Sequence, residues 1–398
     1  MKVLFIGGIY PPHEESKIRA NSKVGLDNAS NNLQFAIIEG LQQFYTDLTV
    51  VSMTPVMTFP RGYKKLFLRD SKFKDDNETH FYCIGFLNIF LLKHLSIYFN
   101  LKKKLKELTA SNEEIIIINY GLHSPKLKVV SDLRRKNSRI KCCLIVPDLP
   151  QYMSERGNLI FNTLKSIDSS IINYYFKNFG FFVLLSKYMY SKLPIFEKPW
   201  VVVEGIYNLP ILDINIEKDK EKVILYTGNL GERSGVRDLI QAFQSIKNKN
   251  YWLWIRGDGP LKKYVLDLIK SGSRIKYFDE MSLLDLHRLL NQATVLINPV
   301  SPNSEFSKFF FPSKLMNYLA SGTPTITFKL ECIPDEYYKY CFVPISQDEL
   351  GLRQTMLDVL EMSNVELESF GKRAMDFIEK NKGSKMQVQK IINLISSK

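Results

Sequence analysis

Short hydrophobic runs alternate with longer stretches of helical periodicity along the whole chain. In the first half, uninterrupted apolar runs predict strands at residues 3–6, 48–52, 115–118, 142–146 and 181–185, and the periodicity near residues 31–45 predicts a helix. Strands that are apolar on both faces and separated by helices are typical of parallel sheets covered on two sides. The N-terminal half is therefore predicted to be a doubly wound α/β domain.

The same alternation restarts near Lys222, with predicted strands at residues 223–226, 252–255, 295–298 and 325–327. Between the halves, residues 194–219 contain three prolines followed by charged residues, as expected of a domain connection. We therefore predict two Rossmann-like domains, at residues 1–200 and 201–398, with ligands at the carboxyl ends of the strands in an interdomain cleft. The helical stretch at residues 366–395 could pack against either domain, including back on the N-terminal one.

The composition agrees with this organisation, because 398 residues with 45% hydrophobic and 24% charged side chains suit two globular cores. The five cysteines are scattered and lack the paired spacing of a zinc site, so we expect buried thiols in a reducing cytosol and no metal. The first apolar run ends at Pro11 and Pro12, too early for a signal peptide. These features predict a cytoplasmic protein.

The net charge of +13 predicts an acidic partner: nucleic acid, an anionic membrane surface or a phosphorylated substrate. The sequence has no zinc finger and no RNA-recognition motif, so nucleic acid is not expected. Residues 81–108 combine aromatic and aliphatic side chains with lysines at 102, 103, 104 and 106, in a run too short to cross a membrane. They predict an interfacial helix on anionic lipid, with a core helix that has a solvated basic end as the alternative.

Residues 305–326 contain the most specific chemical pattern. Pro312 suits the first turn of a helix, where its missing N–H costs nothing. Ser313 and Lys314 then lie in that turn, where unpaired backbone N–H groups and the helix dipole favour an anion. The pattern predicts a phosphate site, and the alternative is that Lys314 points into solvent.

The run "FPSKLMNYLASGTPTI" resembles the donor motif of the large retaining family 4 of GT-B glycosyltransferases, the glycosyl transferases group 1. Residues 225–243, 255–265 and 275–299 are similar to the family's phosphate loop and nucleobase region, and they occur in the family's order. The resemblance implies a GT-B fold with an N-terminal acceptor domain and a C-terminal donor domain. It also implies metal-independent, retaining transfer from a nucleoside-diphosphate sugar, with a UDP-sugar favoured and no cofactor.

The resemblance also implies roles for particular residues. Arg233 and Lys314 would face the donor diphosphate, and His123, in "NYGLHSPK", would be the active-site histidine. Glu305 would offer a carboxylate to the donor sugar, unless it is a solvated loop residue. The remaining implied donor contacts are Gly8, Asn229, Gly257, Asp258, Gly259, Phe278, Ser313 and Asn317.

The N-terminal half offers further polar candidates. Asp148 follows an apolar strand, where acceptor contacts are expected. A cluster of Asn and Asp residues at positions 21, 27, 28, 31 and 32 could bind sugar hydroxyls, but helix capping and turn formation explain most of them equally well.

Three positions depart from the family's pattern: Asn229 replaces an Arg, Ser234 replaces a Lys, and Asn317 replaces the Glu that grips the ribose. Two functions therefore remain open. One is a glycosyltransferase that extends a lipid-linked or polysaccharide acceptor in surface polysaccharide assembly, bound peripherally to the inner face of the cell membrane. The other is a non-catalytic, glycosyltransferase-like partner. A sugar epimerase of similar architecture would need catalytic carboxylates whose motifs are not apparent.

Overall fold

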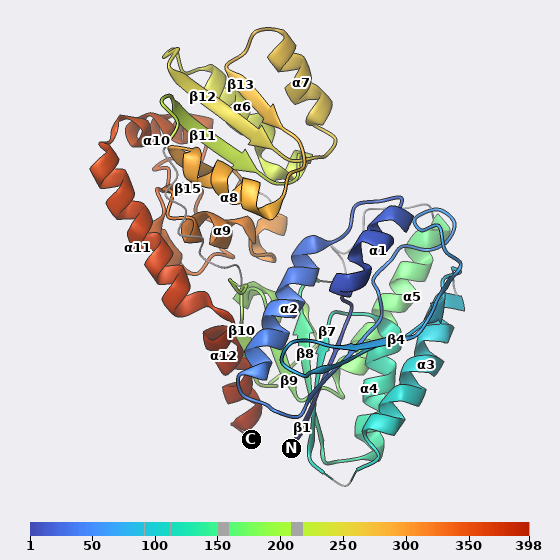
Figure 1. The fold of residues 1–398 in the computed structure, drawn as a ribbon. Coiled ribbons are helices and arrows are strands. Elements are labelled where there is room, and N and C mark those ends of the chain that lie inside the picture. The colour runs from blue at the N-terminus through green and yellow to red at the C-terminus, as the bar shows by residue number, and fades with distance from the viewer. Residues whose placement is uncertain (91, 112, 150–158, 208–217, 304, 398) are drawn as a thin grey trace. The chain divides into compact units, whose positions relative to one another are not determined.

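The computed structural model describes residues 1–398 except 91, 112, 150–158, 208–217, 304 and 398 (Figure 1). The chain divides into two compact units: unit 1 comprises Met1–Ile206 and Ser384–Lys398, and unit 2 comprises Tyr207–Gly383. The first crossing between the units lies near the predicted boundary at residue 200. The final helix, α12 (Ser384–Ser396), is placed in unit 1, which is the packing on the N-terminal domain that the sequence left open.

Unit 1 is built on one sheet with the strand order β10-β9-β8-β7-β1-β2-β5-β4. All neighbouring strands are parallel except β4 and β5, and the order reverses between β1 and β7. The strands are β1 (Lys2–Gly7), β2 (Leu48–Ser52), β4 (Ser71–Lys74), β5 (His80–Cys83), β7 (Ile115–Tyr120), β8 (Ile140–Val146), β9 (Phe181–Leu184) and β10 (Trp200–Val202). A small antiparallel pair, β3 (Phe67–Leu68) and β6 (Phe86–Leu87), accompanies the sheet.

The helices of unit 1 are α1 (Glu15–Asn21), α2 (Asn28–Gln42), α3 (Leu92–Leu108), α4 (Ser124–Lys136), α5 (Leu159–Phe176) and α12. Helices α2 and α12 lie side by side, and their buried residues join one core with the central strands (Figure 1). The two helices approach closely at Gly40, where an added Cβ would lie 2.4 Å from a methyl carbon of Val388. The C-terminal helix is thus an integral layer of unit 1.

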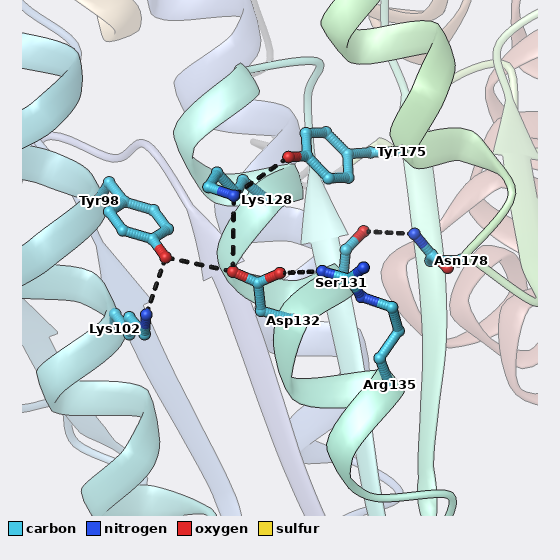
Figure 2. Close-up of polar contacts among 8 residues, drawn as sticks. All are labelled: Tyr98, Lys102, Lys128, Ser131, Asp132, Arg135, Tyr175 and Asn178. Carbon is cyan, nitrogen blue, oxygen red and sulfur yellow. Dashed lines mark hydrogen bonds and ion pairs between the residues drawn. The ribbon is translucent and has the colours of Figure 1, made fainter.

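A polar network joins α3, α4 and α5 (Figure 2). The carboxylate of Asp132 accepts a hydrogen bond from the Tyr98 hydroxyl at 3.2 Å and forms an ion pair with Arg135 at 2.5 Å. Lys128 lies 3.8 Å from the same carboxylate and donates to the Tyr175 hydroxyl at 3.3 Å. This network fixes the three helices against one another.

The prediction of one interfacial helix over residues 81–108 was wrong in its extent. The segment begins with β5 and β6, because the apolar residues at 81–87 complete sheets, and the helix starts only at Leu92. In α3, Ile97, Leu101 and Leu105 are buried, whereas Leu95 and Phe99 are 56% and 61% exposed. The helix therefore has one packed apolar face and a second, uncovered one. No described helix is both long and apolar enough to cross a bilayer.

Unit 2 contains a parallel sheet with the order β13-β12-β11-β14-β15, which reverses between β11 and β14. The strands are β11 (Lys222–Thr227), β12 (Tyr251–Arg256), β13 (Ile275–Phe278), β14 (Val295–Asn298) and β15 (Thr325–Thr327). The helices are α6 (Val236–Gln244), α7 (Lys262–Lys270), α8 (Leu283–Gln292), α9 (Lys314–Ala320), α10 (Glu349–Glu361) and α11 (Asn364–Lys382). Apolar clusters cover both faces of this sheet, so both units are doubly wound, as predicted.

The five cysteines, Cys83, Cys142, Cys143, Cys332 and Cys341, are buried with free thiols. Burial raises the pKa of the Cys142 thiol to about 12, which keeps it protonated and unreactive. These residues therefore serve as small core side chains, in agreement with the sequence prediction.

Candidate functional site

The candidate site of unit 2 begins with a tyrosine at the carboxyl end of β11. Tyr226 is fully buried, and its hydroxyl donates to the backbone oxygen of Asn229 at 2.6 Å. The same hydroxyl accepts a hydrogen bond from the Lys314 amine at 3.0 Å. The tyrosine thus joins the end of β11 to α9 at the point where the strand order reverses, which is where α/β sheets bind their ligands.

Lys314 is a half-buried cation without a paired carboxylate. Its Nζ lies 4.2 Å from the centroid of the Tyr226 ring and beside the backbone of Gly228, where an added Cβ would be 2.8 Å away. Among the described residues, no acidic side chain forms an ion pair with this amine. Burial lowers the pKa of Lys314 to about 7. A nearby anion would restore the charged form, so the position suits a phosphate.

Tyr318 positions Lys314. The two residues are four positions apart on α9 and so share one helix face. The Tyr318 hydroxyl donates to the Thr227 oxygen at 3.0 Å and accepts from the Thr227 N–H at 2.8 Å. These buried bonds fasten α9 to β11, and the lysine one turn earlier is thereby held at the strand end.

Two glycines allow the loops after β11 and β12 to pack backbone against backbone. Gly257 has φ = 150°, and an added Cβ would lie 1.7 Å from the oxygen of Gly228. The Gly228 N–H donates to the Arg256 oxygen at 2.9 Å, and the Leu230 N–H donates to the Asp258 oxygen at 2.9 Å. A side chain at Gly257 would separate these loops, so the glycine is required here for shape.

The structure places the other predicted donor residues of unit 2 as follows. Arg233 lies in a short 3-10 helix, Glu232–Ser234, and is exposed. Ser313 is the N-cap of α9 and is exposed, and Asn317 is half-buried on the same helix. Phe278 packs on Trp254 with ring centroids 5.2 Å apart. The contacts above bring together Tyr226, Gly228, Asn229, Gly257 and Lys314.

Glu305 begins the 3-10 helix Glu305–Lys308, but its side chain lies outside the described residues. The side chains of Asn229 and Asp258 are exposed. Gly259 follows in the same loop, where an added Cβ would come within 2.8 Å of the Leu230 backbone. The roles assigned to these residues from the sequence therefore stay predictions.

In unit 1, His123 lies where predicted, directly after β7 and at the N-cap of α4. Its ring contacts the ring of His94, with centroids 5.0 Å apart. Burial, together with the charges of Lys126, His94 and Lys93, holds the pKa of His123 well below its usual range. The imidazole is therefore neutral at pH 7.

The backbone of Gly8 is held by a side chain of α2. Its N–H donates to Oε1 of Gln34 at 2.8 Å, and its oxygen accepts from Nε2 of the same side chain at 2.8 Å. Both backbone groups are thus engaged by α2, and the donor contact assigned to Gly8 from the sequence stays a prediction. Asp27 caps α2 by accepting from the Ser30 N–H at 3.0 Å, and Asn31 accepts from the Tyr10 N–H at 2.8 Å. Asp27 supports the capping interpretation, whereas Asn31 holds the loop after β1. Asp148 is exposed after β8.

The sequence analysis assigned no role to three residues that lie in these two sites: Tyr226, Tyr318 and Lys126. Tyr226 is the aromatic residue in an otherwise aliphatic part of β11, and a buried tyrosine needs a partner for its hydroxyl. The lone tyrosine in this aliphatic run was therefore a signal that the sequence offered. Arg256, at the end of β12, is a further unassigned residue, and its buried Nε has no hydrogen-bond partner among the described residues.

Comparisons with known proteins agree with this geometry. Residues 221–361 match the protein-family model described as Glycosyl transferases group 1. No curated protein matches the sequence.

Solved structures cover the whole chain at low sequence identity. They include a trehalose-6-phosphate synthase, OtsA, at 12% identity and TM-score 0.69, covering 100% of this chain and 99% of that one. Sucrose-phosphate synthase from Thermosynechococcus elongatus has 12% identity and TM-score 0.66, with the same coverage. Anabaena Alr3699/HepE in complex with UDP has 12% identity and TM-score 0.62, with both chains fully covered. At these identities the likeness shows a shared fold.

Proposed function

We propose that this chain is a glycosyltransferase of the GT-B fold, with a group 1 segment at residues 221–361. It transfers a sugar from a nucleoside-diphosphate sugar to an acceptor hydroxyl. The bond between the sugar C1 and the β-phosphate oxygen breaks, and the acceptor oxygen bonds to C1 with retained configuration. The hydroxyl proton passes to the released diphosphate or to solvent. UDP is the favoured nucleotide, since the similar HepE structure holds UDP.

The observation that carries this proposal is the Lys314 amine. It is half-buried against Tyr226, beside the Gly228 backbone, and no described carboxylate neutralises it. A diphosphate at the end of β11 would supply the missing charge and form a charge-assisted hydrogen bond. Because the leaving diphosphate gains negative charge in the transition state, the same amine would also assist departure. Arg233, on the adjoining loop, is proposed to add a second positive charge without a metal ion.

Unit 1 is proposed to bind the acceptor. His123 is neutral at pH 7 and lies at the carboxyl end of β7, next to the strand-order reversal of its sheet. A neutral imidazole both donates and accepts hydrogen bonds, which suits contact with sugar hydroxyls.

The uncovered face of α3 supports peripheral membrane binding. Leu92, Leu95 and Phe99 are 47%, 56% and 61% exposed, and lysines follow on the same helix. Apolar side chains beside lysines suit an anionic lipid surface. On this basis we propose a lipid-linked acceptor in surface polysaccharide assembly at the inner face of the membrane. Sedimentation with vesicles of 30% anionic lipid, compared with neutral vesicles, tests it, and equal binding to both would contradict the proposal.

The decisive experiment is thermal unfolding with UDP, GDP, ADP, CMP and their sugar conjugates. A ligand that binds only the folded state raises the melting temperature. One diphosphate class should raise the melting temperature of the wild type but have little effect on Lys314→Met. If no nucleotide raises the melting temperature, the alternative of a non-catalytic partner is favoured, to which the neutral Asn317 also points.

A further inference from the structure

Unit 1 holds a cluster of four basic side chains, Lys93, His94, His123 and Lys126, next to the end of β7. Lys126 is the innermost member, with only 6% of its surface exposed. Its Nζ turns back from the first turn of α4 and donates to the Tyr120 oxygen at 2.5 Å. A single neutral carbonyl is thus the hydrogen-bond partner of a buried amine.

The other members lead from Lys126 toward the surface. His123 is half-buried and contacts His94, which is exposed on α3. Lys93, one residue earlier on α3, is half-buried and donates to the backbone oxygen of Val56. Neither imidazole forms a side-chain hydrogen bond with another described residue. The cluster therefore offers hydrogen-bond donors at several depths.

The charges of the cluster are poorly balanced. The amines of Lys93 and Lys126 form hydrogen bonds only with backbone oxygens among the described residues. On α5, the negative charge of Asp168 raises the pKa of His94 and so partly offsets the effect of burial. Burial lowers the pKa of Lys126 to about 7 and that of Lys93 to about 8. Burying charged basic groups without counter-charges is costly, and a bound anion would offset this cost.

We propose that Lys93, His94, His123 and Lys126 bind the phosphoryl group of a phosphorylated acceptor, which makes a phosphate ester the second substrate of this protein. The proposal rests on the glycosyltransferase function, and it adds the chemical class of the acceptor. Two amines and two imidazoles match the several oxygens of a phosphoryl group better than they match a neutral sugar. The ester is either a soluble sugar phosphate or the diphosphate of a lipid-linked sugar.

Bound phosphate raises the pKa values of these amines, so binding takes up protons. Near pH 8 Lys126 is mostly neutral in the unbound protein, and the complex holds it charged. The affinity should therefore fall as the pH rises from 7 to 9, and the heat of binding should depend on the ionisation enthalpy of the buffer. Asp168 favours the charged form of His94 throughout this range.

The test is calorimetric titration of the full chain, without nucleotide, with glucose 6-phosphate and with farnesyl diphosphate. Glucose and farnesol are the uncharged controls. The variants are Lys126→Met, Lys93→Gln and His94→Gln, with Lys103→Gln as the matched control, because Lys103 is an exposed lysine on α3. Each variant is also titrated with UDP, and Lys314→Met is titrated with the preferred ester.

We expect one ester to bind, and its dissociation constant to rise roughly tenfold or more in Lys126→Met and several-fold in Lys93→Gln and His94→Gln. Lys103→Gln and Lys314→Met should bind the ester as the wild type does, and Lys126→Met should still bind UDP. Preference for glucose 6-phosphate identifies a soluble acceptor, and preference for farnesyl diphosphate a lipid-linked one. His94→Gln changes an exposed residue, so it remains informative if Lys126→Met does not fold.

The proposal is overturned if neither ester binds, or if the three cluster variants bind as tightly as the wild type. It is also overturned if Lys314→Met loses ester affinity to the same extent as Lys126→Met, since the ester would then occupy the donor site. Loss of UDP binding by the wild type, with ester binding intact, would instead count against the donor assignment alone.

Discussion

Replacing Lys314 by Met should make the unliganded protein more stable while abolishing its response to the donor diphosphate. The lysine amine is held in a half-buried position where its charged form is disfavoured, and methionine keeps most of its length without the charge. A lysine that served only the fold would behave in the opposite way, because its removal would cost stability. The direction of the change therefore distinguishes a binding role from a structural one.

The magnitude follows from the pKa. A fall from 10.5 to about 7 corresponds, at about 1.4 kcal/mol per unit, to about 4 to 5 kcal/mol for a fully desolvated amine. Because the side chain is only half-buried and solvent screening reduces such an energy, we expect about 2 kcal/mol. As the pH falls from 10.5 toward 7, the lysine gains its proton in the unfolded chain before it does so in the folded protein. The folded protein therefore loses about 2 kcal/mol of stability between pH 10.5 and pH 7. Lys314→Met should gain roughly 2–4 °C in melting temperature per kcal/mol at pH 7 and almost nothing at pH 10.5.

The assay is thermal unfolding of wild type and Lys314→Met at pH 7, 8.5 and 10.5, each with and without UDP. Lys270→Met is the control, because the Lys270 side chain is 79% exposed and lies on α7 of the same unit. The reasoning is refuted if Lys314→Met melts below the wild type at pH 7 and is still stabilised fully by UDP.

Three further outcomes are expected. His123→Ala should bind UDP normally but turn over roughly tenfold more slowly, and unchanged turnover would remove this residue from the site. Gly257→Ala should lower the free energy of unfolding by at least about 2 kcal/mol, since its Cβ would meet the Gly228 oxygen at 1.7 Å, and a neutral result by chemical denaturation would contradict the loop packing. Treatment with EDTA should leave transferase activity intact, whereas activity that returns only with added Mg²⁺ or Mn²⁺ would show that the positive side chains do not suffice.

Most of both sheets could be predicted from the sequence, because their central strands are buried on both faces and appear as continuous apolar runs. β2 and β15 have the predicted bounds. β13 was missed because only its first residue is fully buried and its second is an exposed lysine. β10 was missed because it lies within the proline-containing segment interpreted as a connection. Part of that segment, residues 208–217, lies outside the described residues.

The site was predicted less completely, for a physical reason. The position of Lys314 at the start of a helix follows from local signals around Pro312, and the structure has that helix start. Its contact with Tyr226 joins residues 88 positions apart, and no local pattern specifies such a pairing. The same holds for His94 and Lys93, which reach His123 only because α3 packs beside α4.

The placement of α12 has a consequence for synthesis of the chain. Because unit 1 needs Ser384–Lys398, its core stays incomplete on the ribosome until residues 384–398 have emerged, whereas unit 2 is one continuous segment that can fold earlier. A nascent chain stalled near residue 383 would carry a folded unit 2, but α2 would lack its packing partners Val388 and Ile391. Loss of Ser384–Lys398 would therefore damage unit 1, which otherwise comes from the N-terminal half of the sequence, rather than unit 2.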